Sequence, residues 1–346
     1  MNSKISLSNT CRYEGCTVTG ALAVTAFVPD GISIVHGPSG CTQHNVSLLH
    51  STLMQHEKPS IPRIMTTALG EREIIFGGES ALEKAIGIAL ERSPHAIFVI
   101  STCVAGTIGD DINAVCAPER DVPVIPIDCA GFLNGGFRQG FVSALIGLST
   151  LIGPCAPGGD AGVNIIGERN LEVDAEQNFA EVERILASLD IPVNVRYVRN
   201  AATADMKRFG NAGLNLFRED PGGLLSRFFA QNFSLPAICG YPTGPQAALD
   251  LISRLGAIYK TDCREALREE EAAWEALADD FSDLRGLAVS LAPDPSPADG
   301  RAARDFTEYF GIALSRNAPA VPWSDPVGIG GARRLLRQWR RRAHGY

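Results

Sequence analysis

The sequence predicts an α/β protein with parallel sheets that carry helices on both faces. Short apolar runs of strand length alternate with helical stretches, and this order is typical of parallel sheets covered by helices. Several runs end in turns rich in Gly or Pro, which gather where the strands of an open parallel sheet end and ligands bind. The runs are Ile32–His36, Ala96–Ser101, Val124–Ile127, Val163–Gly167, Val193–Val198, Leu214–Phe217 and Leu235–Cys239.

At 346 residues the chain exceeds the usual size of one hydrophobic core. The stretch Gly153–Gly162 is rich in Gly, Pro and Ala and predicts a linker. Beyond Thr261 we expect one charged helix, a single strand at Leu287–Leu291, a helix at Ala302–Gly311 and a basic terminal helix. A complete doubly wound domain needs more strands than this. The predicted division is a Rossmann-like domain at residues 1–157, a second at 158–260 and an abbreviated third domain at 261–346.

Composition places the chain among ordinary globular proteins, with 45% hydrophobic and 20% charged residues. A net charge of −8 argues against general nucleic-acid binding, which depends on phosphate neutralisation. We find no apolar run long enough to cross a bilayer and no signal-peptide core near the N-terminus, so we expect a cytoplasmic protein without a membrane partner. The basic run from Arg333 to Arg342 could bind an anionic surface, but a solvated helix face is favoured.

Three of the nine cysteines stand in distinctive surroundings. Cys41 and Cys103 each follow a predicted strand directly, so both are expected at the same edge of one sheet, and Cys16 precedes the segment TVTGA. A four-iron cluster takes four cysteines, so three would leave one position for a second subunit. Their spacing matches no CxxC-type signature, and without further motifs all three would be interpreted as core cysteines.

Five motifs lie in and around these cysteine segments: CTVTGA, HGPSGC, TTALGEREIIFGGE, STCVAGTIGDDI and PVIPIDCAGF. Together they resemble the nitrogenase component 1 superfamily, in the order that this family uses. The resemblance implies that Cys16, Cys41 and Cys103 bind an interfacial iron–sulfur cluster, of the P-cluster type (8Fe-7S) or 4Fe-4S, shared with a homologous subunit. Cys11 is the alternative first ligand, because it lies only five residues before Cys16.

The segments VNIIGERN, LNLFREDPGG and LPAICGYPTGP resemble the second domain of the same family. In catalytic subunits of nitrogenase the segment that corresponds to LNLFRE carries a cysteine for the catalytic metal cluster, but here Glu219 stands there. The histidine that completes that site has no counterpart, since only His344 follows His95. The resemblance therefore implies a cofactor-free, beta-type partner subunit without catalytic residues of its own. Gly131 stands where such subunits of classical nitrogenase carry a serine that binds the oxidised cluster.

The chain contains no GxxxxGK[ST] phosphate-binding loop, so ATP hydrolysis would belong to a separate, homodimeric iron-protein reductase. The implied assembly is a heterotetramer whose homologous catalytic subunit holds the catalytic metal cluster. A short, cofactor-free subunit is most similar to that of the methylthio-alkane reductases, which cleave carbon–sulfur bonds and release methanethiol with a hydrocarbon. Alternatives are a tetrapyrrole reductase of the protochlorophyllide or nickel-tetrapyrrole cyclase type, a scaffold for assembly of a nitrogenase-type cofactor, and a metal-free binding protein.

Other polar residues near these motifs have less specific interpretations. His36 and His44 flank the Cys41 turn, and either could donate a hydrogen bond to a cluster sulfur, although structural histidines are commoner. Asp110 and Asp111 precede a predicted helix, so we expect at least one of them to cap it. Cys129 is expected to be a buried apolar cysteine at a strand end.

Overall fold

The computed structural model describes residues 15–54, 62–154, 161–292 and 299–343. By packing, the chain divides into two compact units that do not follow chain order. The cysteine unit comprises Arg12–Val173 and Val193–Cys239, and the C-terminal unit is built from Asp174–Pro192 and Gly240–Tyr346. Most of the predicted linker, residues 155–160, lies outside the described residues, and the three-domain division stays a prediction.

The cysteine unit opens with a four-stranded parallel sheet whose strand order is β2-β1-β3-β4. Three of its strands were predicted within one residue of their observed bounds, whereas the half-buried, three-residue β2 was missed. The strands are β1 (Gly31–His36), β2 (Ile64–Thr66), β3 (Ala96–Ser101) and β4 (Val124–Ile127). The helices are α1 (Thr17–Thr25), α2 (Ser39–Leu53), α3 (Glu71–Phe76), α4 (Glu79–Leu90), α5 (Cys103–Ile108), α6 (Ile112–Cys116) and α7 (Phe137–Gly147).

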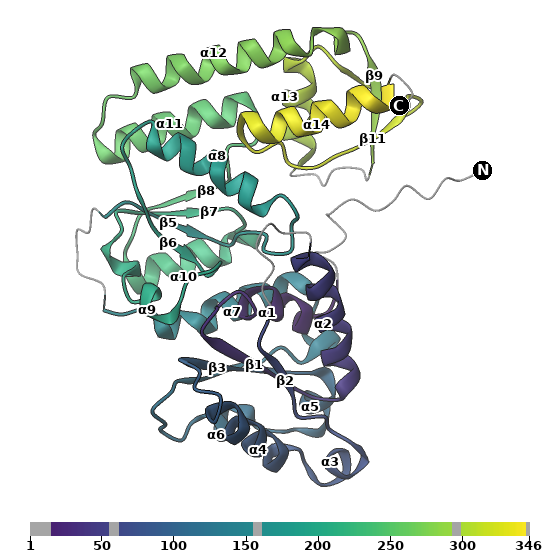
Figure 1. Cartoon of the computed structure of the whole chain (residues 1–346), viewed down its shortest axis with the longest axis vertical. Helices are drawn as coiled ribbons and strands as arrows, with labels where there is room; N and C mark the ends of the chain where they lie inside the picture. Colours follow the sequence, from purple (N-terminus) through teal and green to yellow (C-terminus); the bar gives the residue numbers. More distant parts are fainter. Residues whose placement is uncertain (1–14, 55–61, 155–160, 293–298, 344–346) are drawn as a thin grey trace. The chain divides into compact units, whose positions relative to one another are not determined.

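Helices cover both faces of this sheet (Figure 1), and a separate hydrophobic core lies on each face. Alternate side chains of a strand point to opposite faces, so Ile32 and Ile34 pack with α4 and α6, while Val35 packs with α1 and α7. All nine residues of α1 are buried. Burial on both faces explains why the central strands are continuous apolar runs, as the sequence predicted.

A second four-stranded parallel sheet follows in the same unit, with the equivalent order β6-β5-β7-β8. Its core is aromatic: Tyr197, Phe209 and Phe229 pack with ring centroids 5.4–5.7 Å apart. The elements are β5 (Val163–Ile166), β6 (Val193–Tyr197), α9 (Thr203–Met206), β7 (Leu214–Phe217), α10 (Leu224–Phe233) and β8 (Ala237–Cys239). The predicted α/β class with parallel sheets is confirmed.

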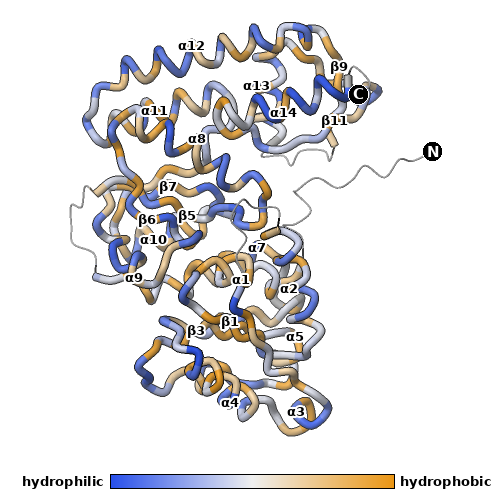
Figure 2. The backbone as a smooth tube through the Cα atoms, in the orientation of Figure 1, coloured by the Kyte–Doolittle hydropathy of each residue, from blue (hydrophilic) through white to orange (hydrophobic). Residues whose placement is uncertain are grey.

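The C-terminal unit combines helices with a small parallel sheet of order β10-β9-β11. The expectation of a single strand was wrong, because the two flanking strands are only two and three residues long and carry no readable pattern. Along α12 the chain alternates between hydrophilic and hydrophobic residues (Figure 2), as expected for a half-buried helix. The elements are α8 (Ala175–Ala187), α11 (Pro245–Tyr259), α12 (Arg264–Asp280), β9 (Ala288–Ala292), α13 (Asp299–Tyr309), β10 (Ala313–Leu314), β11 (Ala320–Pro322) and α14 (Gly328–Ala343).

The basic terminal helix α14 is a structural element of this unit. Arg333 lies 3.0 Å from Asp280, and Arg340 pairs with Asp283 and stacks 4.1 Å from the ring centroid of Phe281. These partners follow or end α12, so acidic residues of the same unit neutralise part of the basic run. Among the described helices, none combines the length and hydrophobicity that a membrane span requires.

Candidate metal centre

Two of the three predicted ligands follow neighbouring strands of the first sheet. Cys41 lies in the first turn of α2, which follows β1, and Cys103 is the first residue of α5, which follows β3. β1 and β3 are parallel and adjacent, and the next strands are added on opposite sides of this pair, β2 beside β1 and β4 beside β3. Such a switch point leaves a crevice at the carboxyl ends of the strands, where open sheets bind ligands. The prediction that both turns meet at one edge is confirmed.

Cys16 is held near this edge by the packing of α1 on α7. It precedes α1 and pairs with Gly136, just before α7, in an isolated β-bridge. The two helices cross at Gly20 and Gly140, where a Cβ atom would lie 1.9 and 1.8 Å from a backbone oxygen of the other helix. No larger residue fits at this crossing, so two glycines fix the position of the helix that Cys16 begins.

The segment after β4 links Cys16 to the end of β3. The hydroxyl of Thr17 donates to the carbonyl oxygens of Cys129 and Gly131, at 2.8 and 2.7 Å. Ser101, the last residue of β3, accepts from the backbone N–H groups of Cys129 and Ala130, at 2.9 and 3.1 Å. These buried bonds satisfy backbone groups that water does not reach, so they fix residues 129–131 between Thr17, next to Cys16, and the end of β3, close to Cys103.

Gly131 lies directly against Cys103. A Cβ atom at Gly131 would be 2.8 Å from the backbone nitrogen and the Cβ of Cys103, and 3.2 Å from its Sγ. The backbone of Gly131 has φ +52°, in the left-handed region that favours glycine. The position at which the resemblance implies a serine in related subunits therefore lies beside a predicted ligand, and here it offers no hydroxyl.

Cys16 and Cys103 belong to the electrostatic surroundings of Cys41. Burial raises the pKa of the Cys41 thiol, and the coulombic effect of Cys103 and Cys16 raises it further. All three side chains are partly exposed. Thiolates that repel one another in this way are stabilised by a cationic metal group, which keeps cysteines deprotonated.

The donor set of this site fits an iron–sulfur cluster, because cysteine thiolates are the usual ligands of such clusters. Across the part of the chain that the structure describes, no three His, Cys, Asp or Glu side chains converge on one ion position. Cys16, Cys41 and Cys103 are the partly exposed thiols at this edge that could hold a cluster.

The first turns of α2 contain polar atoms that the described residues leave unpaired. The side chain of Asn45 donates to the carbonyl oxygen of Cys41 at 2.8 Å, but its Oδ1 has no partner in residues 15–54, 62–154, 161–292 and 299–343. The same holds for the hydroxyl of Thr42. Both residues are buried, and buried polar atoms are normally hydrogen-bonded. The surroundings of Cys41 are thus open to groups that this part of the chain does not supply.

Two further cysteines of the unit belong to the cores. Burial raises the pKa of Cys129 to about 12 and that of Cys116 to about 11, so both are protonated thiols at neutral pH. The interpretation of Cys129 as a buried apolar cysteine agrees with its 1% exposure. The alternative first ligand Cys11, and also Cys155, lie outside the described residues.

The polar residues around the Cys41 turn divide into two groups. Asp111 accepts a hydrogen bond from the backbone of Ala114 and caps α6, so the expected cap is confirmed for this aspartate. Asp110 instead contacts His36, whose ring is fully buried and directed to this carboxylate rather than to a cysteine. His44 is exposed on α2.

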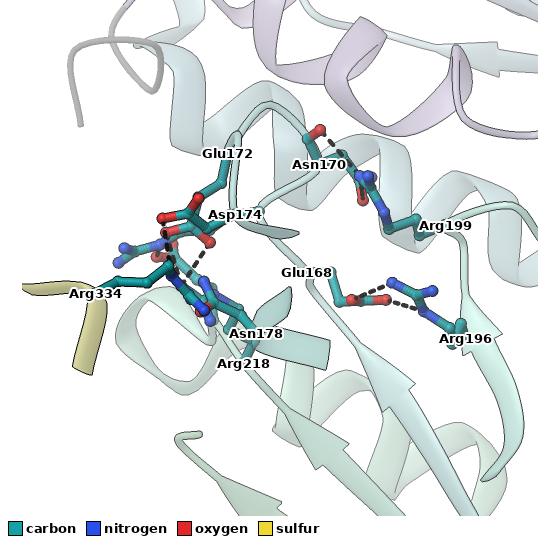
Figure 3. A network of polar contacts seen from close by, with 11 residues as sticks. Glu168, Asn170, Glu172, Asp174, Asn178, Arg196, Arg199, Arg218 and Arg334 are labelled. Atoms are coloured by element: carbon teal, nitrogen blue, oxygen red, sulfur yellow. Dashed lines mark hydrogen bonds and ion pairs between the residues drawn. The ribbon is translucent and has the colours of Figure 1, made fainter. Parts of the chain in front are cut away.

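Ion pairs surround the equivalent switch point of the second sheet, between β5 and β7. Arg169 pairs with Glu219, and Arg218 lies 2.8 Å from Glu172. Figure 3 shows Glu168 and Arg196 facing each other, with both guanidinium contacts within 3.0 Å of the carboxylate. Glu219, for which the sequence resemblance implied the place of a catalytic-cluster cysteine, is therefore paired with an arginine of the same edge.

A cavity of about 540 Å³ lies beside α3 and α4, on the first sheet's side of the cysteine unit. Its lining includes Arg72 and Lys84 together with Phe76. α3 carries strongly exposed apolar side chains, with Ile75 71% and Phe76 82% exposed. Exposed apolar side chains that lie together are typical of surfaces that bind another protein.

Comparison with known proteins gives consistent matches. A model of the family described as nitrogenase component 1 type oxidoreductase matches residues 16–338. The nitrogenase iron-molybdenum cofactor biosynthesis protein NifE of Clostridium pasteurianum is 29% identical over 301 residues, covering 83% of this chain and 64% of that protein. One subunit of the light-independent protochlorophyllide reductase of a Bradyrhizobium species is 27% identical over 318 residues, covering 87% of this chain and 60% of that protein.

Solved structures show the same fold. A structure entitled "Nitrogenase Cp1 at pH 6.5" superposes with a TM-score of 0.70 at 24% sequence identity, covering 89% of this chain and 61% of that one. The chain thus spans about three fifths of the length of the proteins that it matches.

Proposed function

The chain belongs to the nitrogenase component 1 type oxidoreductase family, and on this basis we propose that it is one subunit of an ATP-dependent, nitrogenase-like reductase. Cys16, Cys41 and Cys103 would hold an iron–sulfur cluster at the contact with a homologous subunit, in a heterotetramer. When bound, the cluster supplies one-electron transfer between a reductase and a catalytic metal centre in that other subunit.

The observation that carries this proposal is that three cysteines, from three separate motifs, lie at one edge of the first sheet. Cys41 and Cys103 follow adjacent strands, and the charges of Cys103 and Cys16 both raise the pKa of Cys41. The chain's own residues fix these thiols: Thr17 anchors the helix that Cys16 begins, and Gly131 packs against Cys103. If the three cysteines served only as apolar residues of the hydrophobic core, their partial exposure would have no explanation.

The catalytic metal cluster would lie in the homologous subunit. At the second switch point the place of a metal-binding cysteine is taken by Glu219, which pairs with Arg169. The carboxylate of Glu219 is already neutralised by Arg169, and metal clusters of this kind are held by soft thiolate ligands rather than by a paired carboxylate.

The reductase would be a homodimeric iron protein that brings ATP hydrolysis to the complex. We place its contact at α3, because Ile75 and Phe76 are exposed apolar residues and α3 packs beside α5, which begins at Cys103. This arrangement would bring an electron donor near the cluster ligands.

We infer reductive cleavage of carbon–sulfur bonds in small methylthio-alkanes as the reaction. The complex would add two electrons and two protons to such a thioether, breaking one C–S bond and releasing methanethiol and a hydrocarbon. Support comes from Glu219, which stands where the resemblance implies a catalytic-cluster cysteine in other subunits, as expected for a cofactor-free subunit.

The test is turnover by the anaerobically purified complex with its reductase, ATP and an electron donor. We expect methanethiol and a hydrocarbon in equal amounts by gas chromatography, and loss of both in Cys103→Ala. Cys263→Ala is the matched control, since Cys263 is also partly exposed but lies in the C-terminal unit. An active wild-type complex whose turnover survives Cys103→Ala would contradict the proposal.

A second candidate is a scaffold for assembly of a nitrogenase-type cofactor, favoured by the similarity to NifE. The same cysteines would then hold a cluster on a complex that turns over no substrate. Transfer of iron and sulfur from the purified complex to a cofactor-free enzyme, without methanethiol release, would support this candidate. The similarity to a protochlorophyllide reductase subunit favours a third, tetrapyrrole reduction, which a change in pigment absorbance would detect.

A further inference from the structure

Asp110 occupies a buried position that the proposed function leaves without a role. It comes two residues after α5, the helix that begins at Cys103. Its side chain is only 3% exposed, and its carboxylate accepts from His36 Nε2 at 2.9 Å and from the backbone N–H of Gly78 at 2.8 Å. A buried carboxylate with two donors is a strong local restraint, because hydrogen bonds to an ionised group are stronger than neutral ones.

His36 extends this restraint toward the Cys41 turn. It is the last residue of β1, five positions before Cys41. Burial lowers the pKa of His36 and outweighs the opposing contact with Asp110, so the ring is neutral and Nε2 carries its proton. Nδ1 then accepts from the hydroxyl of Thr67 at 3.1 Å, and that hydroxyl accepts from the backbone N–H of Gly37 at 3.0 Å. The chain of bonds therefore reaches the first residue of the Cys41 turn.

Gly78 extends the restraint toward α3. It lies between α3 and α4, two residues after the exposed Phe76. A Cβ atom at Gly78 would lie 2.6 Å from Asp110 Oδ2 and 3.1 Å from the His36 ring, so only glycine allows this approach. Asp110 thus directly contacts the turn that follows α3.

We propose that Asp110 is a positioning residue that fixes the Cys41 turn, the Cys103 helix and the α3–α4 turn in one arrangement, so that protein contact at α3 is coupled to the geometry of the cysteine sulfurs. The coupling passes from Gly78 through the carboxylate to His36 on one side and to α5 on the other. The inference rests on the proposed function for the roles of the cysteines and of α3, but the restraint itself consists only of contacts between residues of this chain.

The experiment measures the alkylation rate of each cysteine by mass spectrometry, in the full-length chain freed of iron with a chelator and treated with iodoacetamide. In Asp110→Ala we expect Cys41 and Cys103 to react about tenfold faster than in wild type, the factor that corresponds to ~1.4 kcal/mol. Cys16 should be unchanged, because the helix that it begins has no contact with Asp110 among the described hydrogen bonds.

Two variants separate positioning from general destabilisation. Asp111→Ala removes the cap of α6 from the neighbouring residue, which destabilises the fold but leaves the Asp110 contacts in place, so all rates should stay at wild-type values. Asp110→Asn keeps an oxygen for Gly78 and offers its amide to the other tautomer of His36, and should return both rates to within about twofold of wild type. If Asp110→Ala does not fold, Thr67→Val is used in its place, and it should raise the alkylation rate of Cys41 alone.

Equal acceleration of Cys16, Cys41 and Cys103, or the same pattern in Asp111→Ala, would overturn the inference, since either result indicates general loosening. Unchanged rates at Cys41 and Cys103 in a folded Asp110→Ala would also overturn it. A second readout uses the iron-loaded complex: the EPR line shape should change in Asp110→Ala at unchanged iron content. If wild type binds no iron, the proposed function fails while the alkylation result still stands.

Discussion

Replacing Gly131 by alanine tests the close contact between this residue and Cys103. Two costs add in the variant. An L-residue with φ near +52° costs about 1–2 kcal/mol. A Cβ atom 2.8 Å from the backbone and Cβ of Cys103 forces a local shift, for which overpacking in a core costs about 1–3 kcal/mol. We expect Gly131→Ala to lower the free energy of unfolding by about 2–5 kcal/mol in total.

Gly222→Ala is the matched control for this variant. Gly222 has a similar φ of +64°, lies in the same unit, and would meet no atom within 4 Å if it carried a Cβ. It should show only the backbone cost of about 1–2 kcal/mol. Urea unfolding of the cluster-free chain, followed by circular dichroism, gives both values from the midpoint and slope of the transition.

Iron analysis of the anaerobically purified variants extends the test to the cluster. The shift forced by Gly131→Ala moves the backbone of a predicted ligand, so bound iron should fall relative to wild type, while Gly222→Ala should retain it. Equal losses of stability in the two variants would refute the steric argument. Full iron content in a destabilised Gly131→Ala would refute the link between Gly131 and the cluster.

Three further predictions concern buried groups. Burial raises the pKa of Cys129 to about 12, so this thiol's contribution to the free energy of unfolding is fully present below the pKa of the unfolded thiol, ~9. Above that pH the free energy of unfolding falls by ~1.4 kcal/mol per pH unit, up to the pKa of the folded thiol. Cys129→Ala should flatten this part of a series of urea unfolding curves at alkaline pH. Arg196→Met leaves Glu168 unpaired at 4% exposure and should cost about 3–5 kcal/mol, part of which Glu168→Gln restores in the double variant, measured by thermal unfolding. Thr17→Val removes the donor to two buried carbonyl oxygens and should cost about 1–3 kcal/mol, whereas the exposed Thr150→Val should stay within about 0.5 kcal/mol.

The architecture of the two large sheets could be predicted because their central strands are buried on both faces. Such strands are continuous apolar runs, and Ala96–Ser101 and Leu214–Phe217 were predicted with their observed bounds, as was the half-buried edge strand Val124–Ile127. β2, β10 and β11 were missed, since strands of two or three residues at sheet edges lack both length and a complete apolar face. Parallel order then placed Cys41 and Cys103 at one edge without any tertiary information.

The contacts that shape the site could not be predicted in the same way. The sequence favoured a structural role for His36 and expected at least one of Asp110 and Asp111 to cap a helix, but it gave no sign that His36 and Asp110 contact each other, because each residue was interpreted from its own neighbours. Their contact joins positions 74 residues apart and depends on how β1 and α5 pack. The close contact between Gly131 and Cys103 likewise joins segments that follow two different strands, so local sequence could not predict it, and only the family resemblance indicated it.

Cys103 is the residue on which the proposed function depends most, because it would hold part of a metal cluster at a subunit contact. The most direct test is anaerobic co-purification of the tagged chain with the proteins that it binds, followed by iron analysis and EPR of wild type, Cys103→Ala and Cys263→Ala. We expect a brown complex with an unlike homologous subunit, whose cluster signal is lost in Cys103→Ala and kept in Cys263→Ala. A colourless, iron-free chain without a partner, or a signal that survives Cys103→Ala, would contradict this role.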